Sequence, residues 1–152
     1  MNNEVYYKRN RDLLIGILLI MPIYMLVFIV LNMFNLNKGD NSILLPTLMY
    51  CPIIIGIFLS YKFYKNKVNK TFGYIIIAFC ILSLYFYYNT YFVEQEGWNG
   101  IGQYFLWLIN TAISKIMACV FYGKIVGHKK ALIFLGIYAL IVILSFVLGF
   151  WA

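Results

Sequence analysis

The chain of 152 residues alternates long apolar runs with short polar connections. Each of the five apolar runs has roughly the 20 residues that an α-helix needs to cross ~30 Å of hydrocarbon. Backbone inside a bilayer must satisfy its own hydrogen bonds, and none of the runs shows the alternating pattern of a barrel strand, so helices are expected. The predicted helices cover residues 13–34, 43–64, 72–93, 101–122 and 131–151.

The lengths of the connections predict how these helices are arranged. Only about 6 to 9 residues join consecutive runs, so each helix must lie antiparallel beside the next. The first run is too long for the core of a cleaved signal sequence and is expected to remain as a helix. We therefore predict an all-α membrane protein, in which residues 1–152 form one integral membrane domain, a bundle of five transmembrane helices in up-down order.

The basic residues predict the orientation of this bundle. If every run spans, ten of the twelve Lys and Arg fall on one side, whereas the other side has Lys38 with Asp40, Glu94 and Glu96. Basic residues mark the cytoplasmic side, so we expect the N-terminus in the cytoplasm and the C-terminus outside. The ten residues are Lys8, Arg9, Arg11, Lys62, Lys65, Lys67, Lys70, Lys124, Lys129 and Lys130.

Composition narrows the class of protein further. Apolar residues make up 64% of the chain and charged residues 11%, which excludes soluble globular, disordered and coiled-coil proteins. The net charge of +7 could indicate nucleic-acid binding, but the basic residues flank apolar runs and form no basic groove. The expected location is the cell membrane, as a multi-pass protein, or the inner membrane of a Gram-negative cell. The expected partner is the lipid bilayer, not nucleic acid.

The fourth run carries the strongest pattern of polar residues. At 100° per residue its polar side chains form one stripe, and the opposite face is apolar. Such a stripe must face protein or water, because unpaired polar groups in hydrocarbon are costly. The favoured interpretation is hydrogen bonding between helices, and the alternative is a lined pathway or a partner-binding face. The stripe contains Gln103, Trp107, Asn110, Thr111 and Ser114, with Lys115 and Tyr122 at its edge.

Lys115 is an ionisable side chain that lies well inside the predicted fourth span. None of the five acidic residues lies in a predicted span, so no carboxylate is expected beside Lys115. Pro22 removes the bond that the Leu18 carbonyl would normally accept, and this oxygen is a candidate partner if the first and fourth helices touch. Lys115 is either a lysine that snorkels at the edge of the bundle or a gate or anion contact.

The third run and the loop after it supply a weaker set of candidates. Ser83 and Tyr87 follow helical spacing along one face of the run. The loop contains Glu94, Glu96 and Trp98, the one acidic patch on the predicted outer side. Such a loop can meet an external partner, although a solvated hairpin tip is the more common explanation.

Two pairs of small residues are typical of close helix packing. Gly56 and Ser60 lie four residues apart in the second run, and Ser145 and Gly149 do so in the fifth. This spacing lets another helix approach, and packing within the chain is the default interpretation.

The chain offers no set of residues for catalysis or for binding a metal or cofactor. Paired carboxylates are absent from the runs, and the single histidine, His128, lies in a predicted cytoplasmic connection. Cys51, Cys80 and Cys119 are scattered singly, which indicates neither a disulfide framework nor a zinc site. We expect no enzyme activity, no metal and no cofactor.

Three functions remain open. The first is a small non-catalytic membrane protein that recognises a partner within the bilayer, either as an accessory subunit of a membrane complex or as an immunity protein against a membrane-inserting toxin. The second is a small oligomeric transporter or channel lined by the polar face of the fourth helix. The third is a membrane enzyme that acts on lipid, for which no catalytic pair is evident.

Overall fold

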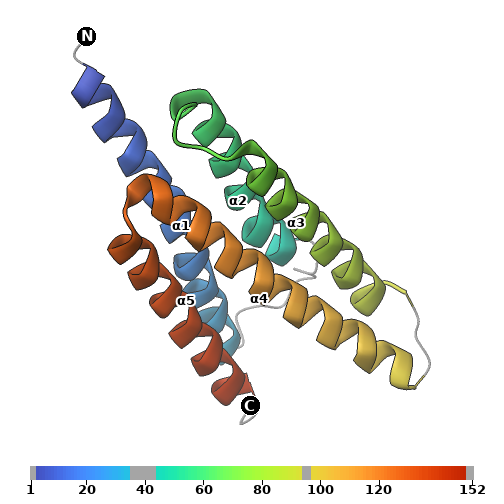
Figure 1. The fold of residues 1–152 in the computed structure, drawn as a ribbon. Helices are drawn as coiled ribbons and strands as arrows, with labels where there is room; N and C mark the ends of the chain where they lie inside the picture. The colour runs from blue at the N-terminus through green and yellow to red at the C-terminus, as the bar shows by residue number, and fades with distance from the viewer. Residues whose placement is uncertain (1–2, 35–43, 94–96, 150–152) are drawn as a thin grey trace.

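A computed structural model describes residues 3–34, 44–93 and 97–149, except for the side chains of some positions in the first, second and fifth helices. Within these ranges the chain has five α-helices and no strand, which confirms the all-helical prediction (Figure 1). The helices are α1 (Asn3–Met33), α2 (Leu44–Phe63), α3 (Lys70–Tyr91), α4 (Trp98–Val126) and α5 (His128–Gly149).

The helices form one bundle in which consecutive members run antiparallel (Figure 1). Each helix packs on the next, and α1 also packs on α5, so the five helices close into a ring. The most extensive pairing is between α3 and α4, and α4 also reaches α1. As a result, the polar face of α4 is surrounded by other helices.

The predicted helix boundaries differ from those of the structure at the turn between α4 and α5. The expected connection of about eight residues is wrong, because α4 continues to Val126 and α5 begins at His128. Gly127 alone joins them, with a φ of 102° that side-chain-bearing residues rarely adopt. The basic residues of this region therefore lie in the last turn of α4 and the first turn of α5.

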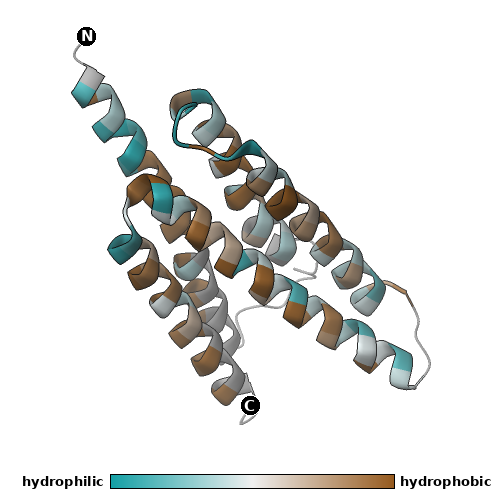
Figure 2. Ribbon diagram, in the orientation of Figure 1, coloured by the Kyte–Doolittle hydropathy of each residue, from teal (hydrophilic) through white to brown (hydrophobic). Residues whose placement is uncertain are grey.

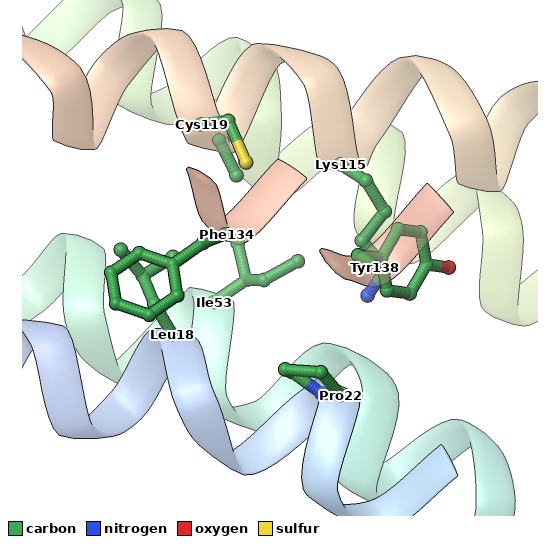
Figure 3. A pocket seen from close by; sticks show the side chains of 8 residues that line it. Leu18, Pro22, Ile53, Lys115, Cys119, Phe134 and Tyr138 are labelled. Carbon is green, nitrogen blue, oxygen red and sulfur yellow. The ribbon is translucent and has the colours of Figure 1, made fainter. Parts of the chain in front are cut away.

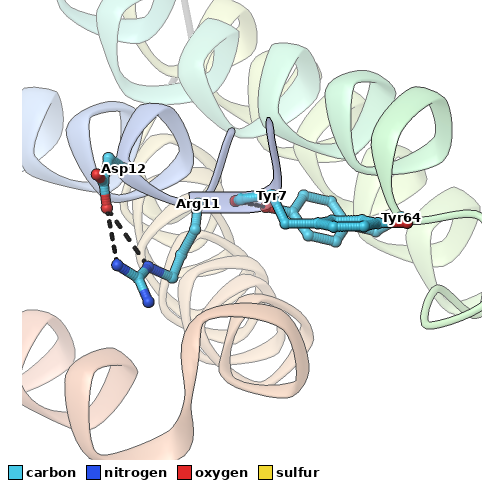
Figure 4. Close-up of polar contacts among 4 residues, drawn as sticks. All are labelled: Tyr7, Arg11, Asp12 and Tyr64. Carbon is cyan, nitrogen blue, oxygen red and sulfur yellow. Dashed lines mark hydrogen bonds and ion pairs between the residues drawn. The ribbon is translucent and has the colours of Figure 1, made fainter. Parts of the chain in front are cut away.

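The first helix begins at Asn3, ten residues before the apolar run that predicted it. Its basic first turns are held against the end of α2, where the Tyr64 hydroxyl donates to the Tyr7 carbonyl oxygen at 3.1 Å. Figure 4 shows the Tyr7 and Tyr64 rings side by side, with centroids 5.9 Å apart. The same view shows Arg11 paired with Asp12 at 3.2 Å. These contacts explain why the helix extends beyond its apolar part.

Polar positions gather at one end of the bundle, and apolar positions cover its outward faces. Figure 2 shows hydrophilic positions concentrated at the end that holds the start of α1, the α2–α3 turn and the α4–α5 turn. Along the length of the bundle, large apolar side chains point outward, and Phe58, Ile81, Ile109 and Leu140 are each more than half exposed. The buried core includes Leu14, Ile53, Ile57, Ile76, Cys80, Phe121 and Tyr122.

Two helices, α3 and α4, are long and apolar enough over the described residues to cross a membrane. A shorter apolar stretch covers Met49–Phe63 of α2. Length and composition thus give weak support for membrane association.

Candidate functional site

The polar stripe of α4 is buried against its neighbours. Asn110, Thr111, Ser114 and Lys115 are each at most 6% exposed, whereas Ile109 on the opposite face is 56% exposed. The stripe therefore faces the bundle interior. It forms part of a buried polar centre, defined here as Met49, Tyr50, Ser83, Trp107, Asn110, Thr111 and Lys115, which joins α2, α3 and α4.

Asn110 links α4 to α3. Its Nδ2 donates to the carbonyl oxygen of Phe79 at 2.7 Å and to Ser83 Oγ at 2.6 Å. Because the Phe79 carbonyl lies in the helix backbone, the amide adds a second bond to an oxygen that already serves the α3 ladder. Both hydrogens of the Asn110 amide are thus satisfied within the bundle, as are most buried polar groups in proteins.

Tyr50 links α2 to the same face of α4. Trp107 Nε1 donates to the Tyr50 hydroxyl at 3.2 Å, and this hydroxyl lies 2.6 Å from Thr111 Oγ1. Because the indole N–H is only a donor, the Tyr50 oxygen accepts from Trp107, and its own hydrogen is available for Thr111. Three side chains from two helices therefore form one chain of hydrogen bonds.

Lys115 extends from α4 toward α2. Its Nζ donates to the Met49 carbonyl oxygen at 2.6 Å, and it lies 5.0 Å from the centroid of the Tyr50 ring and 5.9 Å from that of Tyr138. Aromatic faces attract a cation at these distances, which offsets part of its loss of hydration. The sequence indicated the Leu18 carbonyl as a candidate acceptor, which stays a prediction, and the bond described here goes to the Met49 carbonyl.

A small cavity lies beside Lys115 and is otherwise lined mainly by apolar groups (Figure 3). Its volume is about 30 Å³, which exceeds the ~10–15 Å³ that a single water molecule requires. Figure 3 shows the Lys115 side chain reaching into the space between Tyr138 and Pro22. Leu18 and Pro22 of α1 also line the cavity, so α1 closes this side of the polar centre.

Tyr122, one turn beyond Ala118 on α4, forms a third link to α2. Its hydroxyl donates to the Ile53 carbonyl oxygen at 2.8 Å. The hydroxyl occupies the space beside Gly56, where a Cβ would lie 2.9 Å from Tyr122 Cζ and closer still to the oxygen. Ser60 Oγ donates to the Gly56 carbonyl oxygen at 2.7 Å. The Gly56–Ser60 pair thus admits a tyrosine side chain, which differs from the close helix approach that its spacing indicated.

The N-terminal part of the stripe on α4 ends in an aromatic cluster. Tyr87 is buried, with its ring centroid 5.5 Å from that of Trp107 and 4.6 Å from that of Tyr91. Gln103 is half-buried, and its Oε1 has no hydrogen-bond partner among the described residues. Trp98 is 85% exposed at the start of α4. The other members of the predicted outer-loop patch, Glu94 and Glu96, lie outside the described residues, as does the packing of Ser145 and Gly149.

The structure brings together seven of the predicted site residues in or beside one buried centre: Ser83, Tyr87, Trp107, Asn110, Thr111, Ser114 and Lys115. Sequence reasoning missed Tyr50, the α2 residue on which two of the bonds converge. Tyr50 is one of 14 tyrosines, and its apolar run has no stripe of polar residues that would indicate a buried polar face. Among the described residues, no group of three His, Cys, Asp or Glu could hold a metal ion, and all three cysteines are free thiols.

No known family model matches this chain, and neither the curated proteins nor the solved structures give a match.

Proposed function

We propose that the chain is an integral membrane bundle in which all five helices span the bilayer, with the N-terminus in the cytoplasm. The outward faces support this proposal, because soluble monomers do not expose apolar side chains continuously along every face. Leu132, Ile133 and Ile143 of α5 are 59% to 64% exposed, as expected of side chains that contact lipid. The ten basic residues at one end of the bundle agree with the orientation.

We further propose that the protein acts without catalysis, by recognising a partner within the bilayer. The partner is another subunit of a membrane complex or a membrane-inserting toxin that the protein neutralises. One observation carries this proposal: the polar stripe of α4 is closed by bonds to α2 and α3. Its polar groups serve the bundle, so recognition is left to the outward faces of the helices.

The alternative function is a channel or transporter, and Lys115 beside the cavity is the observation that favours it. The cavity of about 30 Å³ has room for about two or three water molecules and is far too short to be a pathway. A pathway through a single chain would require the hydrogen bonds of Asn110, Tyr50 and Lys115 to open together. An oligomer could conduct along its subunit interfaces, so the alternative requires its own test.

Ion flux from liposomes that contain only the purified protein separates the two functions. The partner proposal predicts no flux above that of empty liposomes, together with co-purification of one defined membrane protein or toxin domain. A channel lined by Lys115 predicts flux, and the substitution Lys115→Glu would then invert its preference between anions and cations. The variant Ile109→Leu, on the exposed face of α4, is the matched control for expression and insertion.

A further inference from the structure

The turn between α2 and α3 concentrates positive charge on a short segment. Four lysines lie within residues 62–70, and the sequence has no acidic residue between Asp40 and Glu94. All four lysine side chains are exposed, and Figure 2 shows the turn as a hydrophilic segment at the basic end of the bundle. Exposed charge of one sign attracts groups of the opposite sign. We name Lys62, Lys65, Lys67 and Lys70 the lysine turn.

Hydrogen bonds tie the lysine turn to the ends of both helices. The Tyr61 hydroxyl donates to the Lys70 carbonyl oxygen at 2.8 Å, which joins the last turn of α2 to the first residue of α3. Between the helices, the backbone N–H of Lys67 donates to the Tyr64 carbonyl oxygen at 2.8 Å. A segment that is already held in place loses less entropy when it binds a ligand.

Gly73 provides the space that the Tyr61 ring occupies. A Cβ at Gly73 would lie 2.9 Å from Tyr61 Cζ and closer still to the hydroxyl oxygen. The ring therefore crosses from α2 to α3 at a position where a larger residue would displace it. The bond from Tyr61 to Lys70, and with it the arrangement of the lysine turn, depends on this glycine.

Exposed aromatic rings lie on the membrane side of the lysine turn. Phe58 lies one helical turn before Lys62, Tyr74 lies one helical turn after Lys70, and both rings are 58% exposed. Residues four positions apart share a helix face, so each of these two lysines has an aromatic neighbour. The two rings flank that of Tyr61, with centroid distances of 6.5 Å for Phe58 and 5.7 Å for Tyr74. Tyrosine rings at the end of a spanning helix are typical of the boundary between headgroups and acyl chains.

We propose that the lysine turn, held by Tyr61, binds the headgroups of anionic phospholipids at the cytoplasmic surface of the membrane. The exposed ammonium groups pair with the headgroup phosphates, and the rings of Phe58 and Tyr74 contact the upper part of the acyl chains. An acidic soluble protein would match the charge, but it would not reach rings that face the bilayer, so the rings favour lipid. This inference rests on the proposed placement of the bundle in the bilayer.

The test identifies the lipid that lies beside the lysine turn. In the full-length chain without its three native cysteines, a fluorophore is attached to a cysteine introduced by Ile75→Cys, next to Tyr74, or by Tyr85→Cys, nearer the other end of α3. Both positions are exposed. The protein is placed in phosphatidylcholine vesicles with the same small fraction of brominated phosphatidylglycerol or brominated phosphatidylcholine. At position 75 we expect phosphatidylglycerol to quench at least about twofold more strongly, and at position 85 we expect equal quenching.

Two pairs of lysines separate the turn from the basic end as a whole. Lys65→Gln/Lys67→Gln should remove most of the preference for phosphatidylglycerol at position 75. The matched control, Lys129→Gln/Lys130→Gln, removes the same charge from α5 and should leave most of the preference. Equal losses in the two pairs would show diffuse attraction by the whole end and would overturn the inference.

A variant that keeps every lysine tests the arrangement of the turn. Gly73→Ala displaces the Tyr61 ring and should reduce the preference at position 75, with helical content retained by circular dichroism. If Gly73→Ala does not fold, Tyr61→Phe removes only the bond to the Lys70 carbonyl oxygen and should act in the same direction. Full preference in a folded variant of either kind would contradict the role assigned to Tyr61.

Two further measurements identify the partner and isolate the cause of a failure. Equal quenching by the two lipids at position 75, with binding of polyglutamate that requires Lys65 and Lys67, would assign the turn to an acidic protein and overturn the lipid. Alkaline carbonate extraction of membranes tests the placement itself. A protein released by carbonate contradicts the proposed function, whereas a protein that stays in the membrane but lacks lipid preference contradicts this inference alone.

Discussion

Replacement of Gly56 by alanine should destabilise the bundle, although alanine is the better helix former. The new Cβ would lie 2.9 Å from Tyr122 Cζ and closer still to the hydroxyl oxygen. Tyr122 is fully buried, so its ring cannot swing out to solvent or lipid. The ring must shift, and its hydrogen bond to the Ile53 carbonyl oxygen is stretched or lost.

The size of the effect follows from three contributions. Overpacking of a filled core costs about 1–3 kcal/mol, and loss of the Tyr122 hydrogen bond adds about 1 kcal/mol. The helix propensity of alanine returns up to ~1 kcal/mol. We therefore expect Gly56→Ala to lower the free energy of unfolding by about 1–3 kcal/mol. Gly136→Ala in α5 is the matched control, because nothing lies within 4 Å of its new Cβ.

A double-mutant cycle with Tyr122→Phe tests the cause. The phenylalanine lacks the oxygen that lies closest to the new Cβ. The double variant should therefore lose less unfolding free energy than the sum of the two single losses, by at least about 1 kcal/mol. Unfolding in mixed micelles of increasing denaturing-detergent fraction, followed by circular dichroism, gives the four free energies. Additive effects, or a Gly56→Ala variant as stable as Gly136→Ala, would refute the role assigned to Gly56.

Three further predictions concern the polar centre and the exposed faces. Asn110→Leu should lower the free energy of unfolding by about 1–2 kcal/mol, because two interhelical hydrogen bonds are lost. Ile109→Leu on the exposed face should change it by less than ~0.5 kcal/mol. Equal free energies for the two variants in the same detergent titration would show that the polar stripe does not stabilise the bundle. Lys115→Met should unfold within ~1 kcal/mol of the native chain or be more stable, because it removes a buried charge and keeps the volume. Lys115→Ala should be about 2 kcal/mol less stable than Lys115→Met because it leaves a void. In thermal unfolding, a Lys115→Met variant more than ~1 kcal/mol less stable than the native chain would show that the cation itself stabilises the centre. In a variant without the three native cysteines, a fluorophore is attached to a cysteine introduced by Leu140→Cys or by Ser114→Cys. Brominated lipid should quench the fluorophore strongly at position 140 and weakly at position 114. Equal quenching would contradict the assignment of outward and inward faces.

The apolar runs were sufficient to predict the five helices, because runs of this length have few other ways to satisfy their backbone hydrogen bonds. The ends of the helices were harder to predict from the sequence. The first turns of α1 are polar, and they are held by contacts of Tyr7 with Tyr64, the residue that follows α2, which no local pattern reveals. The single-residue turn at Gly127 likewise depends on its φ of 102°, which a glycine allows but does not require.

The polar centre was predicted in part. Helical spacing on α4 identified the buried face of Asn110, Thr111 and Ser114, since polar residues at that spacing have to share one side. Their partners could not be predicted in the same way. Tyr50 and the carbonyl oxygens of Met49 and Phe79 lie on other helices, and the choice among them depends on helix rotation and height. Apart from a carbonyl freed by a proline, as Pro22 frees that of Leu18, a backbone carbonyl has no sequence signature.

The topology of the chain tests the central claim most directly. A reporter that is active only outside the cytoplasm and one that is active only within it are fused in turn after Ala152. Five spanning helices with a cytoplasmic N-terminus predict activity of the external reporter alone. Fusions within the α2–α3 turn at Lys67 and beside Gly127 should show the opposite pattern, because these turns share the basic end of the bundle. Cytoplasmic activity after Ala152 would contradict the five-span bundle.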